Sequence, residues 1–282
     1  MRLDIYVAQH WPDQSRSTWQ KLIQAGNVKV NGTVQTVPKF ELGENDKVEV
    51  TEPTPADHSA ESLPVIYEDD NVIVINKPVG VLTHSKGALN DEFTVAEFVR
   101  SKTSYKSDTN RPGIIHRLDR ATSGVIICAK NDETASYLSK QFSQRTVKKE
   151  YAAVTVGIPA ESEAIIDLPI GRSPSAPSTF RVDSKGKQAE TYYKVISASD
   201  TNALVSLKPK TGRTHQLRVH LAYINCPILG DPVYGTTPSD RMYLHAHQLE
   251  ITLPGGIRQT FTSPIPKSFM SKVTSSETKA RH

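Results

Sequence analysis

The chain has 282 residues and a formal net charge of +4, and 37% of its residues are hydrophobic and 23% charged. This composition is typical of a soluble globular protein with one large domain, or one large and one small. No apolar run approaches the roughly 20 residues of a membrane span, and the N-terminus lacks the apolar core of a secretion signal. The cysteines, Cys128 and Cys226, follow no spacing pattern, so we expect reduced thiols in a cytoplasmic protein.

Two helices are predicted at the start of a small N-terminal unit, residues 1–52. The first ten residues carry apolar side chains at helical spacing. Residues 15–26 predict a second helix, with Ser15 or Ser17 as its N-cap and Gly26 at its end.

Short strands complete this unit. Residues 28–35 alternate around Asn31 and Gly32, a pair typical of a tight hairpin turn, and residues 46–50 predict another strand. Residues 53–63 are polar, contain prolines and show no periodicity, so we interpret them as a linker.

A larger domain of mixed elements is expected over residues 64–266. Helices and strands do not alternate strictly along it, which favours an α+β fold with a largely antiparallel sheet. Helices are predicted at residues 131–142, capped by Asn131, and 214–224. Strands are predicted at residues 71–78, 150–157, 190–197 and 203–209. Residues 267–282 are rich in Ser, Thr and Lys, and we expect them to be disordered.

The charges are unevenly distributed. Residues 1–52 hold six Lys or Arg against seven Asp or Glu, whereas residues 172–220 hold nine against three. Such a basic stretch suits a polyanionic partner, but a solvated cationic surface explains it equally well. The sequence shows neither a phosphate-binding glycine loop nor a cluster of metal ligands, so a cofactor-free domain is expected.

Asp119 stands alone among cations in the segment "RPGIIHRLDRATSG", residues 111–124. Nearby cations favour the ionised form of a carboxylate, so Asp119 is a candidate nucleophile or base. A turn or capping role is the alternative.

A second candidate region covers residues 208–220. Gly212 is expected to end a strand and Thr214 to cap the following helix, on whose polar face His215 and Arg218 lie three residues apart. Arg218 could reach a buried carboxylate with two hydrogen bonds, or the helix could simply present a basic surface.

These segments resemble a known family. His116 to Gly124 is similar to the H-R-L-D-x-x-T-S-G signature of the RluA/RluD-type pseudouridine synthases, and three further segments match that family in the same order: residues 67–84, 148–157 and 210–235. Residues 1–52 resemble the S4-type RNA-binding domain, also called the alpha-L motif. The resemblance implies a pseudouridine-synthase fold with a largely antiparallel mixed sheet, preceded by a small α/β RNA-binding domain.

The resemblance also implies a reaction. Such an enzyme breaks the glycosidic C–N bond of a uridine within RNA, rotates the base and rejoins it through carbon 5, without cofactor or metal. By this resemblance Asp119 is the nucleophile and Arg218 pairs with it. Tyr151 packs against the base, and removal of the carbon-5 proton is its alternative role, for which a tyrosine with a pKa of about 10 is a poor base at neutral pH. Whether Asp119 attacks the sugar or the base, or deprotonates the sugar, is left open.

RNA contacts are implied as well. Arg117 is expected to enter the RNA and hold the flipped-out uridine, whose extrusion costs a few kcal/mol. Further contacts are expected from His116, Arg120, Lys148, Lys149, Arg213 and His215, and from Arg16, Lys21 and Lys29 in the N-terminal domain. The expected substrate is large-subunit rRNA or a ribosomal assembly intermediate in a bacterial cytoplasm, bound by a monomer. The alternatives are a synthase for tRNA or for both RNAs, and a non-catalytic RNA-binding assembly factor.

Overall fold

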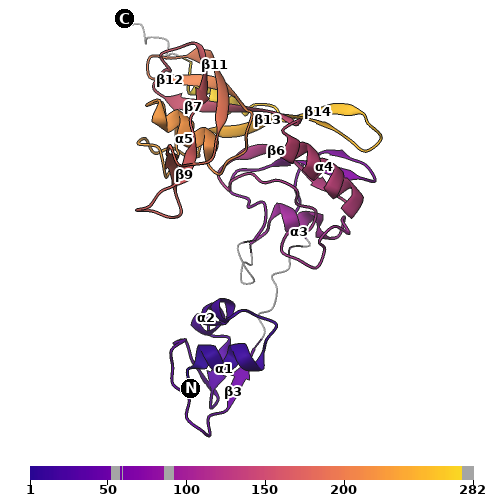
Figure 1. The fold of residues 1–282 in the computed structure, drawn as a ribbon, viewed down its shortest axis with the longest axis vertical. Helices are drawn as coiled ribbons and strands as arrows, with labels where there is room; N and C mark the ends of the chain where they lie inside the picture. Colours follow the sequence, from indigo (N-terminus) through magenta and orange to yellow (C-terminus); the bar gives the residue numbers. More distant parts are fainter. Residues whose placement is uncertain (52–57, 59, 86–91, 275–282) are drawn as a thin grey trace, which may run out of the picture. The chain divides into compact units, whose positions relative to one another are not determined.

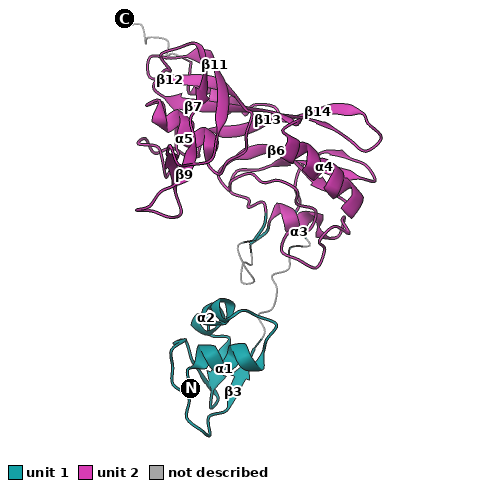
Figure 2. Cartoon of the chain, in the orientation of Figure 1, with its two compact units in different colours: residues 1–61, 84–93 teal, residues 62–83, 94–282 magenta. Residues whose placement is uncertain are grey.

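The computed structural model (Figure 1) describes residues 1–51, 58, 60–85 and 92–274. The chain divides into two compact units (Figure 2), one formed by residues 1–61 with 84–93, the other by residues 62–83 with 94–282. Most of the predicted linker lies outside the described residues. Within the described ranges, no helix is long and apolar enough to cross a membrane.

The first unit consists of α1 (Leu3–His10), α2 (Arg16–Gln24) and a small antiparallel sheet of β1 (Val28–Val30), β2 (Thr33–Val34) and β3 (Val48–Val50). As predicted, Ser15 caps α2, because its hydroxyl accepts a hydrogen bond from the backbone N–H of Thr18. Asn31 and Gly32 have φ angles of 53° and 78°, the left-handed values that a tight hairpin turn requires.

A nine-stranded sheet forms the centre of the second unit, in the order β4-β5-β6-β13-β7-β12-β11-β8, with β14 also paired to β13. All neighbouring pairs are antiparallel except β13 and β6, which confirms the predicted α+β fold. The strands are β4 (Val65–Glu68), β5 (Val72–Lys77), β6 (Ser123–Ala129), β7 (Lys148–Val156), β8 (Glu163–Asp167), β11 (Glu190–Ala198), β12 (Asn202–Pro209), β13 (Leu244–Thr252) and β14 (Arg258–Thr262).

Helices and a short ribbon cover this sheet. They are α3 (Val95–Arg100), α4 (Asp132–Gln144), α5 (Gln216–Tyr223) and the pair β9 (Ile170–Arg172) with β10 (Phe180–Val182). Figure 1 shows α4 beside β6, and α5 beside β7 and β12. Asn131 caps α4 as predicted, since its side chain accepts a hydrogen bond from the N–H of Thr134.

Two hydrophobic clusters meet along β13. Its first residue, Leu244, packs with residues of β7, β12 and α5, whereas Leu249 and Ile251 pack with residues of β5, β6 and α4. Each end of β13, at the centre of the sheet, is therefore packed into its own hydrophobic cluster. In the strand order β13 lies between β6 and β7. The loops and side chains at this point have a fixed framework on which a site can be built.

Two predictions about the C-terminal half need correction. Residues 267–271, expected to be disordered, form α6 (Lys267–Ser271), because Phe269 is fully buried against Tyr243 at a ring-centroid distance of 5.0 Å. Residues 275–282 of that predicted tail lie outside the described residues. Thr214 does not cap α5, which begins after His215; this residue has a left-handed φ of 57° and no capping side-chain hydrogen bond.

Candidate active site

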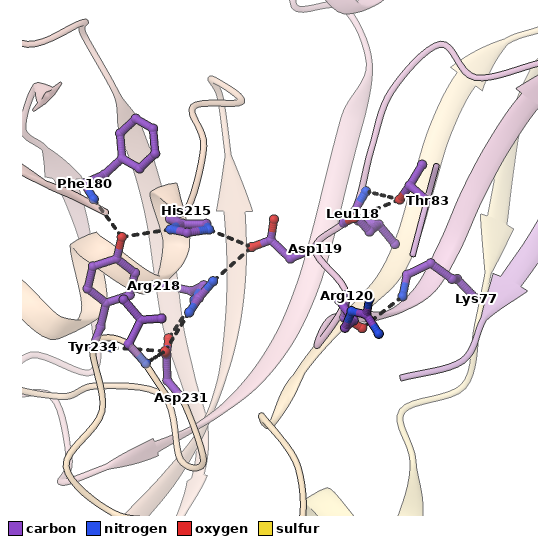
Figure 3. Close-up of polar contacts among 11 residues, drawn as sticks. Lys77, Thr83, Leu118, Asp119, Arg120, Phe180, His215, Arg218, Asp231 and Tyr234 are labelled. Carbon is purple, nitrogen blue, oxygen red and sulfur yellow. Dashed lines mark hydrogen bonds and ion pairs between the residues drawn. The ribbon is translucent and has the colours of Figure 1, made fainter. Parts of the chain in front are cut away.

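Asp119 lies in the loop that leads into β6, and both of its neighbours are anchored. Thr83 donates its hydroxyl proton to the carbonyl of Leu118 at 2.8 Å and accepts the Leu118 N–H at 3.1 Å. Lys77 donates to the carbonyl of Arg120 at 3.3 Å and to the carbonyls of Pro78 and Val81 at 2.9 and 2.8 Å. These contacts (Figure 3) hold the backbone on each side of Asp119.

Sheet register brings this loop close to Tyr151. Ala246 of β13 pairs with Gly124 at the start of β6 on one side and with Tyr151 of β7 on the other. Gly124 has a φ of 111°, and a Cβ added there would lie 2.1 Å from the carbonyl oxygen of Ala246. Only glycine permits both this conformation and this close approach.

Asp119, Tyr151 and Arg218 line one cavity of about 160 Å³ in the second unit. The structure thus brings together the three residues that the sequence analysis selected as catalytic. The Asp119 side chain keeps 24% of its surface exposed. Of its two oxygens Oδ2 accepts the contacts of Arg218 and His215, whereas Oδ1 accepts no hydrogen bond from the described residues. One carboxylate oxygen is therefore open to a reactant in the cavity.

Arg218 lies between two carboxylates (Figure 3). Its Nη1 donates to Oδ2 of Asp119 at 3.2 Å, and its Nε and Nη2 donate to both oxygens of Asp231 at 2.7 Å. Burial alone would lower the pKa of Arg218, but the two carboxylates raise it above its usual value. Burial opposes ionisation of Asp231 too, yet hydrogen bonds from Arg218 and from the N–H groups of Val233 and Tyr234 hold its pKa below the usual range.

His215 links Asp119 to Tyr234. The hydroxyl of Tyr234 accepts the N–H of Phe180 at 2.9 Å and lies 2.8 Å from Nδ1 of His215. Because the carboxylate of Asp119 can only accept, the neutral ring carries its proton on Nε2, which faces Oδ2 at 3.7 Å, and the Tyr234 hydroxyl donates to Nδ1. Burial lowers the pKa of His215, in spite of the nearby Asp119, which favours this neutral ring.

Tyr151 forms an aromatic wall of the cavity. Burial, together with the charge of Asp119, raises the pKa of its hydroxyl far above the usual value. A phenol of this kind stays protonated at neutral pH. Its ring can pack against a planar ligand beside Asp119.

Comparison with known proteins decides the family. The sequence model described as RNA pseudouridylate synthase matches residues 71–223, and the S4 domain model matches residues 1–48. The chain belongs to the RNA pseudouridylate synthase family. It is therefore a pseudouridine synthase, an isomerase, with an N-terminal S4 RNA-binding domain, and both predicted resemblances are confirmed.

Relatives agree with this assignment to the pseudouridine synthases. The chain is 37% identical to the ribosomal large subunit pseudouridine synthase D of Nitrosomonas europaea, over 94% of this chain and 81% of the relative. It is 36% identical to an uncharacterized RNA pseudouridine synthase of Bacillus subtilis, over 94% and 91%. Among solved structures, human RNA pseudouridylate synthase domain containing 1 aligns with a TM-score of 0.61 at 30% identity, covering 76% of this chain and 86% of that one.

The predicted RNA contacts of this pseudouridine synthase fall into different environments. Arg117, Lys149 and Arg213 line the cavity together with His215, and Arg120 is exposed. Lys148 forms an ion pair with Glu250 at 3.1 Å. The described residues contain no group of three His, Cys, Asp or Glu side chains that could hold a metal ion.

His116 differs from its prediction as a cationic RNA contact. Its Nε2 accepts the backbone N–H of Ile127 at 3.1 Å, and burial lowers its pKa to about 3. The ring stacks on Phe142 with centroids 4.7 Å apart. His116 is therefore uncharged at neutral pH and holds the Asp119 loop against β6.

In the S4 domain Arg16 also has a structural partner. Its Nε and Nη2 donate to Oδ2 of the buried Asp4 at 3.0 and 2.9 Å, and Arg2 and Gln20 donate to the same carboxylate. Lys21 and Lys29 are exposed and can meet RNA phosphates.

Asp231 and Tyr234 are the site residues that sequence reasoning missed. Both lie in residues 210–235, a segment that was matched to the family only as a whole. Their contact with Arg218 and His215 bridges 13 and 19 residues, and no local pattern indicates such a pairing. The sequence offered one indication: Asp231 and Tyr234 are polar and follow closely after the helix that carries Arg218.

Proposed function

We propose that this pseudouridine synthase acts on specific uridines of large-subunit rRNA in the bacterial cytoplasm, with Asp119 as the essential nucleophile. The observation that carries the catalytic role is the open Oδ1 of Asp119 in a cavity that Tyr151 and Arg218 also line. The printed name of the Nitrosomonas relative, together with the S4 domain, supports the rRNA substrate.

The site supplies groups for breaking the C–N bond and for holding the freed base. Asp119, paired with the adjacent Arg218 cation, attacks through its open oxygen while the C–N bond to the uracil breaks. Attack on the sugar, attack on the base and removal of a sugar proton all use this oxygen. The neutral Tyr151 ring packs against the base during its rotation.

Arg117 is placed to hold the substrate before reaction. It is exposed, lies two residues before Asp119 and lines the cavity. An arginine there can occupy the space that an extruded uridine leaves in the RNA and pair with its phosphates. Unpaired loops are the favoured targets, because extrusion costs least where the base has no partner.

Pseudouridine mapping tests this proposal. Unmodified large-subunit rRNA and unmodified tRNA are each incubated with the wild-type enzyme, with Asp119→Asn, or with Asp200→Asn as a control for an exposed carboxylate on the β11–β12 turn. Carbodiimide-dependent reverse-transcription stops are expected with wild type and the control, and none with Asp119→Asn. Residual product with Asp119→Asn would refute the nucleophile, and stops only in tRNA would refute the rRNA substrate.

A further inference from the structure

A second cavity, of about 400 Å³, continues the first. The two are lined in common by Arg117, Lys149, Tyr151, Thr211, Gly212 and Arg213. Its volume is within the range of about 300–1,000 Å³ that is typical of small-molecule sites. Asp119 and Arg218 line the first cavity and not the second, so the second space is available to another part of the substrate.

The lining of the second cavity is strongly cationic. It includes no acidic residue and five basic ones: Arg117, Arg145, Lys149, Lys210 and Arg213. Lys210 is already paired with Glu190 at 2.9 Å, and the Nε of Arg213 donates to the carbonyl of Gln188. The cavity nevertheless keeps a net positive field, which attracts an anionic ligand.

Lys149 is a partly buried basic residue of this cavity and has no counter-ion among the described residues. Its Nζ donates one hydrogen bond, to the carbonyl of Thr211 at 3.3 Å, and it forms no ion pair with the residues described. Its neighbour Lys148, by contrast, is paired with Glu250. Burial lowers the pKa of Lys149 to about 8, because a charge removed from water without a counter-ion is unfavourable. An anion bound at Nζ would remove this penalty.

Aromatic rings complete the cavity wall. His116 and Phe142 both line it and stack on each other with an interplanar angle of 22°. Such rings are the platforms on which bases of single-stranded nucleic acids stack. A cation for a phosphate and rings for a base together match one nucleotide.

We propose that the second cavity is a subsite for the nucleotide next to the target uridine, and that Lys149 pairs with the phosphodiester joining the two. Lys149 is one of the six residues that line both cavities, so its Nζ lies where a link between their occupants can pass. The inference rests on the proposed function, because it assumes that the first cavity receives the uridine of an RNA strand.

Turnover measurements test the phosphate contact. The substrate is an RNA fragment around a mapped uridine, with an uncharged methylphosphonate at one or the other flanking phosphate. Lys149→Met, which keeps length but removes charge, should lower kcat/KM about tenfold, as should one of the two methylphosphonates with wild type. When the Lys149→Met enzyme acts on that methylphosphonate substrate, kcat/KM should fall no further than with either change alone, because both changes remove the same contact. If the effect of Lys149→Met on kcat/KM multiplies with that of the methylphosphonate at each of the two flanking phosphates, Lys149 contacts neither phosphate and the proposal is wrong.

Binding gives a readout that does not depend on turnover. An oligouridylate is titrated in fluorescence anisotropy into Asp119→Asn, alone or combined with Lys149→Met, Lys149→Arg or the control Lys267→Met on α6. Loss of one phosphate contact should weaken binding. It should also reduce the salt slope, which is the steepness of the fall of log K with log salt concentration, by about 0.7. Lys149→Arg should retain the slope, and the control should change nothing. An unchanged slope with Lys149→Met would refute the subsite, even if rRNA proved not to be the substrate.

Discussion

Arg218 is bound more tightly to Asp231 than to Asp119: it donates two hydrogen bonds of 2.7 Å to the former and one of 3.2 Å to the latter. Asp231 is itself fixed by two backbone N–H groups. The guanidinium therefore has a structural partner that sets its position and a candidate catalytic partner that receives the remaining donor. This asymmetry leaves Asp119 paired through one oxygen and only partly covered.

Asp231→Asn should separate these two functions of Arg218. An amide accepts through one oxygen only, so Arg218 would lose its fixed position and turn toward Asp119. We expect kcat to fall by about 100-fold, the order expected for a displaced catalytic group, with KM changed much less. Removing one partner of a buried pair should also lower the free energy of unfolding by about 3 kcal/mol.

Steady-state kinetics and urea unfolding measure both effects. Unfolding should be followed by circular dichroism, because both tryptophans, Trp11 and Trp19, lie in the N-terminal unit and report on it alone. Asp200→Asn serves as the control for loss of an exposed carboxylate. Wild-type kcat in Asp231→Asn would show that Asp119 needs no such anchoring.

Tyr234→Phe tests the hydrogen-bond chain through His215. The substitution removes the hydroxyl that receives the Phe180 N–H and fixes the tautomer of His215. One hydrogen bond contributes about 1 kcal/mol, so we expect kcat to fall about fivefold at neutral pH. The acid limb of the pH profile of kcat should also move, since the His215 ring loses its hydrogen bond with the Tyr234 hydroxyl. A profile identical to wild type would argue that the chain does not influence Asp119.

Buried histidines should make the catalytic unit sensitive to acid. Burial lowers the pKa of His116 to about 3 and that of His245 to about 4, from an ordinary value of 6.5. Between pH 6.5 and 4 the unfolded chain binds protons that the folded chain does not. The free energy of unfolding therefore decreases as the pH is lowered through this range. Each ring should contribute up to about 1.4 kcal/mol per pH unit.

Urea unfolding at several pH values, again followed by circular dichroism, checks this slope. His116→Gln removes one titrating ring while keeping an acceptor for the Ile127 N–H, so the slope should decrease by one ring's contribution. His10→Gln, an exposed substitution on α1, should leave it unchanged. Equal slopes for His116→Gln and wild type would show that His116 is not held neutral.

Local patterns explain what the sequence could predict. Ser15, Asn131 and the Asn31–Gly32 turn act on backbone groups within three residues of themselves, so short motifs suffice to find them. Asp119, Tyr151 and Arg218 were found by resemblance, and their approach depends on strand register across β6, β13 and β7. No periodicity in one segment specifies that register.

Burial explains what the sequence could not predict. His116 was interpreted as a cation, but it is partly buried and neutral. Arg16 is exposed, as an RNA contact requires, but it is also paired with the buried Asp4. Asp231 remained undetected because its role depends on Arg218, 13 residues away in sequence. Charges in a sequence identify candidates, and only the fold shows which of them already have a partner.

Gly124→Ala should be among the most damaging substitutions in the sheet. Its Cβ would lie 2.1 Å from the carbonyl oxygen of Ala246, so β6 and β13 must separate where the Asp119 loop ends. Gly255→Ala is a matched control, because Gly255 also has a positive φ, of 89°, but nothing lies within 4 Å of its added Cβ. The control should lose only about 1 kcal/mol of unfolding free energy from the unfavourable backbone conformation. Gly124→Ala should lose more than about 4 kcal/mol or fail to fold, and equal losses in the two variants would refute the steric argument.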